Sequence, residues 1–153
     1  MRHPLRVPAI FLFSLLVSTA FSYQNEVKIS AGMNENGVVV FELKSEVMKM
    51  VPVNNLSVTP GGVNAWDLGK PSWRLELKPG SYIDLDRAVY GESIPGFEST
   101  LPEALQPDIH YLVGVRGAGF AKSLEFYISE SNSGQRVLHV CAAPKNRPNL
   151  ACE

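Results

Sequence analysis

The sequence predicts an all-β domain of roughly seven or eight short strands, folded as a β-sandwich or a partly open barrel. Two observations predict it. Apolar and polar residues alternate over several short segments, as in strands with one buried face, and Pro and Gly separate these segments. No stretch has a sustained helical period, and no internal repeat or linker divides the chain. We therefore expect one domain with almost no helix.

Residues 1–22 have the layout of a secretory signal peptide. Two arginines precede an apolar core over 9–17, and small residues up to position 22 favour cleavage before Tyr23. The alternative, an uncleaved membrane anchor, is disfavoured because the core is shorter than the roughly 20 residues that span a bilayer. We expect an exported domain over 23–153, periplasmic or secreted, with no membrane span after cleavage.

The charge of the chain gives no support for strongly anionic partners. The full sequence has 14 basic and 15 acidic residues and a net charge of -1, and losing the two arginines of the signal takes it to -3. A mildly acidic, evenly mixed surface gives no reason to expect nucleic acid or an anionic membrane as partner.

The first half of the domain reads as a hairpin followed by a less regular stretch. Segments 26–30 and 37–43 flank a turn containing Asn36-Gly37, which predicts two paired strands. Segment 43–53 is ambiguous, since Pro52 would confine a strand there to an edge or a bulge. A strand over 56–58 is expected to stop at Pro60-Gly61-Gly62.

The second half contains the clearest alternation. Strands are expected over 73–77, 81–86, 124–128 and 136–140, with a turn at Pro79-Gly80 and others at 117–119 and 131–134. Residues 90–106 are rich in Gly, Pro and Ser and read as a loop, with at most one helical turn near 102–105.

Between that loop and the strand at 124–128 lies the most informative stretch. Every second residue from Leu105 to Val115 is apolar or proline, in the order Leu105, Pro107, Ile109, Tyr111, Val113, Val115. This pattern resembles the tyrosine corner of fibronectin type III and other immunoglobulin-like β-sandwiches, in which a tyrosine at the start of the sixth strand bonds backbone a few residues upstream. The resemblance implies an immunoglobulin-like sandwich with Leu105, Pro107 and Tyr111 as its corner, and it implies no activity.

The chain departs from that family in three respects. Ile109 stands where the family usually has threonine, and an extra strand and tail follow residue 128. The family's early tryptophan has two possible matches, Trp66 and Trp73, and the sequence does not choose between them.

Cys141 and Cys152 both lie in the C-terminal tail, and in an exported chain a disulfide is the default reading. The closed loop is short, so the chain-entropy model gives roughly 3 kcal/mol at best. A zinc site that includes His139 is the alternative, but no fourth ligand or recognisable ligand pair is visible. We expect the disulfide to pin the tail to the last strand.

The sequence offers no clear catalytic or metal site. His110 and His139 each lie in a predicted strand, and no Gly-x-Ser-x-Gly nucleophile pattern occurs, so we interpret both as exposed or edge-strand residues. Asp84 and Asp86 share one strand face, but a calcium loop needs more oxygen ligands, and a glycosidase pair is defined by a separation that sequence does not give. We expect a non-enzymatic protein without a cofactor.

The segment 90–97 is the best candidate for recognition, since it displays Tyr90, Ile94 and Phe97 among turn formers and loops on a rigid sandwich often carry binding. The alternative is that the three side chains close one end of the core.

The leading hypothesis is protein binding in the cell envelope or medium, as an inhibitor or an immunity-like protein. The runner-up is carbohydrate or small-ligand binding on a sheet face, with Tyr127 as a candidate. A hydrolase comes third. Asn55-Leu-Ser57 matches the N-glycosylation pattern, which matters only in a eukaryotic secretory pathway.

Overall fold

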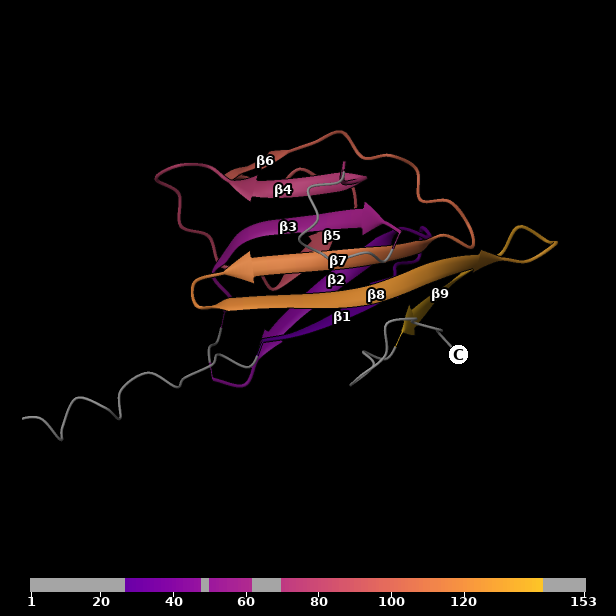
Figure 1. Cartoon of the computed structure of the whole chain (residues 1–153), viewed down its shortest axis with the longest axis horizontal. Helices are drawn as coiled ribbons and strands as arrows, with labels where there is room; N and C mark the ends of the chain where they lie inside the picture. The colour runs from indigo at the N-terminus through magenta and orange to yellow at the C-terminus, as the bar shows by residue number, and fades with distance from the viewer. Residues whose placement is uncertain (1–26, 48–49, 62–69, 142–153) are drawn as a thin grey trace, which may run out of the picture.

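The computed structural model describes residues 27–47, 50–61 and 70–141, and over these the chain is all-β, with no helix. Within these residues, nine strands form two antiparallel sheets (Figure 1). The smaller sheet has the order β1-β2-β5, and the larger has the order β6-β4-β3-β7-β8-β9. The strands are β1 Val27–Met33, β2 Val39–Ser45, β3 Val53–Pro60, β4 Trp73–Leu77, β5 Arg87–Val89, β6 Phe97–Ser99, β7 His110–Gly117, β8 Phe120–Glu130 and β9 Arg136–Cys141.

One hydrophobic core is built from the inward faces of both sheets. Alternate residues of each strand enter it, and Trp73, Phe41 and Phe126 are its largest fully buried members. The rings of Phe41 in β2 and Phe126 in β8 lie 5.7 Å apart and join the two sheets directly. β1 packs against β8 and β9. This arrangement of two facing sheets is consistent with the expected β-sandwich.

Several expected elements are confirmed. β1 and β2 form the first hairpin, and Gly37 in its turn has φ 72°, a left-handed conformation that glycine adopts without a steric penalty. β4 spans the expected residues, with Trp73 and Leu75 fully buried. β3 and β8 are longer than their sequence patterns indicated.

The prediction of a strand over 81–86 is wrong. This segment makes an isolated bridge between Pro52 and Asp84 and a bond from the Leu85 N–H to the Val51 oxygen at 2.8 Å, and the strand β5 begins only at Arg87. Pro52 has no N–H and cannot continue a ladder, so pairing at this point stays local. β5 then pairs with β2 instead.

The loop expected over 90–106 contains the short strand β6, and the possible helical turn near 102–105 is absent. The Thr100 N–H bonds to the oxygen of Arg74, and the Glu103 N–H bonds to the oxygen of Ser72, at 3.0 and 2.8 Å. A helical turn over 102–105 would need the Gln106 N–H as donor to the Pro102 oxygen, and this N–H instead donates to the Tyr111 hydroxyl.

The corner before β7 has the contact that its sequence pattern predicts. Tyr111 is 3% exposed, and its hydroxyl oxygen accepts a hydrogen bond from the N–H of Gln106 at 2.8 Å. Its ring stacks on Phe126 at 5.6 Å, and Leu105 is buried beside the same core. Pro107 is half-buried in the turn between them. This bond joins the end of the loop to the start of β7.

Some expectations fall outside the described residues. These are the signal peptide over 1–22, Trp66 and the disulfide partner Cys152. Within the described ranges, no helix has the length and apolar character to cross a membrane.

Candidate functional site

The segment 90–97 ends in the core rather than on the surface. Phe97 opens β6 opposite Leu77 and is 5% exposed, so it is a core residue and not an exposed anchor. Tyr90 and Ile94 are half-buried and pack against the same core. The segment therefore offers a partner only the outward parts of Tyr90 and Ile94 and the polar residues between them.

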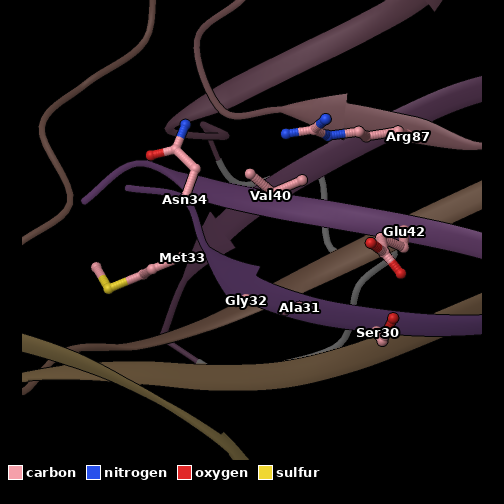
Figure 2. A pocket seen from close by; sticks show the side chains of 8 residues that line it. All are labelled: Ser30, Ala31, Gly32, Met33, Asn34, Val40, Glu42 and Arg87. Carbon is pink, nitrogen blue, oxygen red and sulfur yellow. The ribbon is translucent and has the colours of Figure 1, made fainter. Parts of the chain in front are cut away.

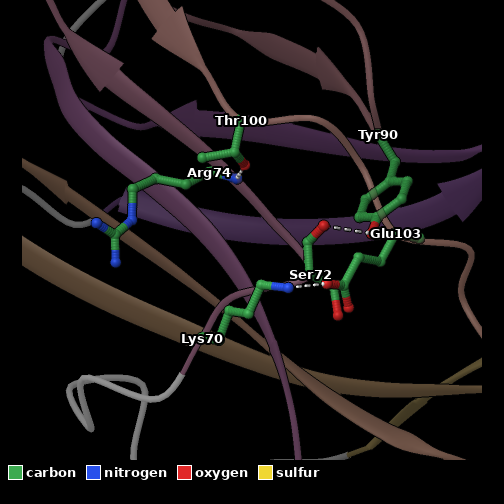
Figure 3. A network of polar contacts seen from close by, with 6 residues as sticks. All are labelled: Lys70, Ser72, Arg74, Tyr90, Thr100 and Glu103. Carbon is green, nitrogen blue, oxygen red and sulfur yellow. Dashed lines mark hydrogen bonds and ion pairs between the residues drawn. The ribbon is translucent and has the colours of Figure 1, made fainter.

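Tyr90 fixes the base of this loop. Its hydroxyl donates to the backbone oxygen of Glu103 at 2.7 Å and lies 3.2 Å from that of Ser72 (Figure 3). Its ring packs at a tilt on Trp73, with ring centroids 5.3 Å apart. Burial, followed by the nearby Tyr111 and Glu103, raises the pKa of Tyr90 to about 12. The hydroxyl therefore stays a donor at neutral pH.

Two further contacts hold the next part of the chain along β4 (Figure 3). The N–H of Arg74 donates to Thr100 Oγ1 at 2.9 Å, and Lys70 Nζ pairs with Glu103 at 2.7 Å. The ion pair is exposed and contributes little to stability. The Arg74 N–H belongs to strand β4, so its bond holds Thr100 beside that strand. The loop that follows β5 is thus anchored at both ends.

A depression of about 780 Å³, here called the loop depression, lies beside this anchored loop. Its wall comes from the β1–β2 turn and from residues 85–95, and its volume is within the range of roughly 300–1,000 Å³ typical of ligand sites. The lining residues are Asn34, Asn36, Val38, Leu85, Arg87, Val89, Tyr90, Gly91, Glu92, Ser93, Ile94 and Pro95. Two of the three predicted binding residues, Tyr90 and Ile94, therefore line one surface.

A second depression of about 300 Å³, the sheet depression, lies on the outer face of β1, β2 and β5 (Figure 2). Val40 forms its floor and is only 7% exposed although it points outward from β2. Gly32 stands opposite Val40 in β1, and because it has no side chain the surface stays hollow. The lining residues are Ser30, Ala31, Gly32, Met33, Asn34, Val40, Glu42 and Arg87. Asn34 and Arg87 border both depressions.

The two histidines lie on the outer face of the larger sheet, stacked on one tyrosine. The rings of His110 and Tyr127 have centroids 5.2 Å apart at 11°, and those of Tyr127 and His139 are 4.5 Å apart at 10°. These residues are direct cross-strand partners in β7, β8 and β9. Both ring faces of Tyr127 are therefore covered, and this ring offers no face on which a sugar could stack.

One histidine is paired with a buried acid. His110 Nδ1 lies 2.7 Å from Glu125 Oε1, and the Glu125 side chain is 6% exposed. The other carboxylate oxygen, Oε2, has no hydrogen-bond partner among the described residues. Burial of a carboxylate is costly without a partner, so His110 stabilises this position.

A Ser–His contact is also present, between Ser129 Oγ and His139 Nε2 at 2.8 Å. A catalytic nucleophile needs a base that is itself oriented by a third group and a place for the substrate. Within the described part of the chain no acid contacts His139, and neither residue lines the two depressions. The contact fits a cross-strand hydrogen bond between β8 and β9.

Metal-ligating atoms approach one another at one place in the described residues. One ligand atom each from His110, Glu125 and Cys141 lie within 4.8 Å of one another, and His139 is not in this group. A thiolate ligand and the predicted disulfide to Cys152 would use the same sulfur atom, and a structural zinc site needs a fourth ligand. Asp84 and Asp86 are not in any such group among the described residues.

Sequence reasoning missed the residues that join the two depressions. Neither Arg87, which follows Asp86, nor Asn34 in the first turn was among the predicted binding residues. A signal for Asn34 did exist, since asparagine before a glycine turn commonly accepts backbone N–H groups. No signal could place Arg87 beside it, because β5 reaches the hairpin only through tertiary pairing. The glycosylation candidate Asn55 is half-buried in β3.

Comparison of this chain with protein-family models, curated proteins and solved structures finds no match in any of the three.

Proposed function

We propose that this chain is an exported, non-enzymatic binding module of the cell envelope, whose partner is another protein bound at the loop depression. The observation that carries the proposal is the anchoring of this surface. The loop after β5 is fixed by the Tyr90 hydroxyl and by β6, so its outward residues are pre-organised beside the β1–β2 turn. Pre-organised surfaces bind with a smaller entropy cost, which favours recognition.

The composition of the depression supports a protein partner over a buried small ligand. Apolar side chains, including Val89 and Ile94, alternate with Arg87 and several amide or hydroxyl groups. A mixture of apolar and polar side chains is typical of protein interfaces, in which arginine and tyrosine are enriched. The carbohydrate alternative relied on Tyr127, whose ring faces are occupied by the two histidines.

The strand pairing supports an immunoglobulin-like assignment. In that fold, strands A, B and E share one sheet, and strands C, F and G share the other. Here β1, β2 and β5 share a sheet, and β3, β7 and β8 are neighbours in the other, with the corner tyrosine at the start of β7. β4 and β6 then lie beyond β3 at one edge of the larger sheet, and β9 lies beyond β8 at the other edge. We propose this assignment together with the binding role.

The proposal is tested by affinity capture from the envelope extract and culture medium of the source organism, with mass spectrometry of the bound material. Ser93 is exposed on the rim of the loop depression, and Ser93→Arg fills that rim without touching the core. Ser123→Arg makes the same change on exposed β8, outside both depressions.

We expect one near-stoichiometric protein that Ser93→Arg abolishes and Ser123→Arg retains. Equal capture by both variants would place the partner elsewhere, and no capture by the unmodified chain would argue against the protein-binding role.

A further inference from the structure

Asn34 presents two N–H donors at the junction of the two depressions. Its Oδ1 accepts the N–H groups of Asn36 at 3.0 Å and Val38 at 2.9 Å, which fixes the orientation of the amide. Its Nδ2 therefore points away from the turn, as Figure 2 shows. No acceptor for this Nδ2 occurs among the described residues.

Arg87 lies at the same junction without an internal acid. It stands directly across from Glu42 in the β2–β5 pairing, but the Glu42 carboxylate pairs with Lys44 at 3.1 Å. In Figure 2 the guanidinium of Arg87 extends over Val40 on the side of Asn34, away from the Glu42 carboxylate. Over the described ranges, no hydrogen bond or ion pair engages this guanidinium.

The charges at the junction select the kind of acceptor. Each depression is lined by one cation, Arg87, and one acid, which is Glu42 in the sheet depression and Glu92 in the loop depression. A doubly charged phosphate would be repelled by these acids with a single guanidinium to balance it. A carboxylate carries one charge, and its two oxygens match the planar fork of arginine.

We infer that Arg87 and Asn34 form a carboxylate clamp that receives an Asp or Glu side chain of the partner protein. The inference rests on the proposed function, because it names the chemistry of the partner at the same surface. Val40 and Val89 are direct cross-strand partners in β2 and β5, so they form one apolar area beside the clamp, and Ile94 lines the loop depression.

This layout also indicates the shape of the bound segment. In an extended chain, every second side chain points to the same side, about 6.6 Å apart. A segment with an apolar side chain two residues from the acid would therefore place that side chain near the adjacent Val40 and Val89 while the acid meets the clamp. The occupant is an extended acidic segment of a protein, with an apolar residue two positions from the acid.

The test uses ¹H–¹⁵N NMR of the protein purified after expression of the full chain, titrated with acetyl-Val-Ser-Glu-Ser-Val-amide. The matched peptide has Gln in place of Glu. For a five-residue probe we expect a dissociation constant on the order of 1 mM. The Arg87 Nε–H and Asn34 Nδ2–H₂ signals should shift and saturate with the Glu peptide, and binding of the Gln peptide should be about tenfold weaker or more.

Two variants test the clamp without disturbing the fold. Asn34→Asp keeps an oxygen that caps the turn but replaces the two donors with negative charge, and Arg87→Gln removes the guanidinium at an exposed position. Each should weaken Glu-peptide binding about tenfold or more. Lys122→Gln makes an equal change of charge on exposed β8, outside both depressions, and should leave binding unchanged.

Equal binding of the two peptides, or unchanged binding to Asn34→Asp, would overturn the clamp. Tighter binding of inorganic phosphate than of the Glu peptide would overturn the choice of a carboxylate. The two proposals fail separately. If capture of a protein partner depends on Ser93 but not on Arg87, the proposed function stands and the clamp is wrong. If the Glu peptide binds at Arg87 and Asn34 but no protein is captured, the carboxylate site stands and the proposed protein-binding function is wrong.

Discussion

The hydroxyl of Tyr111 gives the sharpest test of how the corner holds this fold together. Tyr111→Phe removes one oxygen atom and keeps the ring, which packs in the core against Phe126. The atom that is lost accepts the Gln106 N–H at 2.8 Å, and this bond ties the end of the long loop to the start of strand β7.

The expected cost follows from the two partners. A hydrogen bond of this kind contributes about 1 kcal/mol net, and a buried donor left without a partner costs about 1–3 kcal/mol. Gln106 is an exposed residue, so water can reach its N–H after the substitution. We therefore expect the free energy of unfolding to fall by about 1.5 kcal/mol, at the lower end of these values.

Urea denaturation measures this change, with an unchanged slope of unfolding free energy against urea concentration because the buried area stays the same. Tyr82→Phe is the control, since Tyr82 is 76% exposed, and its substitution should change stability by less than about 0.5 kcal/mol. If Tyr111→Phe and Tyr82→Phe have equal effects, the hydrogen bond does not stabilise the corner and the reasoning is wrong.

Three further predictions concern the corner, the buried acid and the loop anchor. Asp108 has φ 60°, so Asp108→Gly should keep or raise stability while Asp108→Ala should lower it by about 1 kcal/mol, as measured in urea; equal effects would show that no strain resides there. His110→Phe keeps the ring stack but leaves the Glu125 carboxylate unpaired, so it should cost about 3 kcal/mol, and adding Glu125→Leu should recover much of this; additive losses in the double-mutant cycle would contradict the pairing. The pKa of Tyr90 is raised from 10.0 to about 12, so the folded state favours the protonated hydroxyl, and the stability gained is present below pH 10 and lost as the pH rises from 10 to 12. For this half-exposed group the loss is about 1 kcal/mol, and thermal unfolding of Tyr90→Phe over the same pH range should lack it.

The local pattern of the sequence was sufficient for most of the strands. Period-two alternation located β4, and the glycine turn located the β1–β2 hairpin, because both depend on residues close in the chain. The corner was predictable for the same reason, since Tyr111 reaches a backbone group only five residues away.

Local pattern failed where a partner strand decided the outcome. Segment 81–86 alternates as a strand should, but the proline opposite it prevents a ladder, and the pairing moves on to Arg87–Val89. Phe97 looked exposed among turn formers, and it is buried because β6 pairs with β4.

The sequence by itself determined the all-β class, the turn positions and the corner, because these follow from alternation, from backbone-permissive residues and from contacts within a few residues. Only the tertiary structure decided which side chains meet. Arg87 and Asn34 are far apart in the chain and border the same depressions because β5 pairs with β2. His110, Tyr127 and His139 stack because three strands share one register. Strand register is set by the packing of the whole core, so the candidate site could not be read from any local segment.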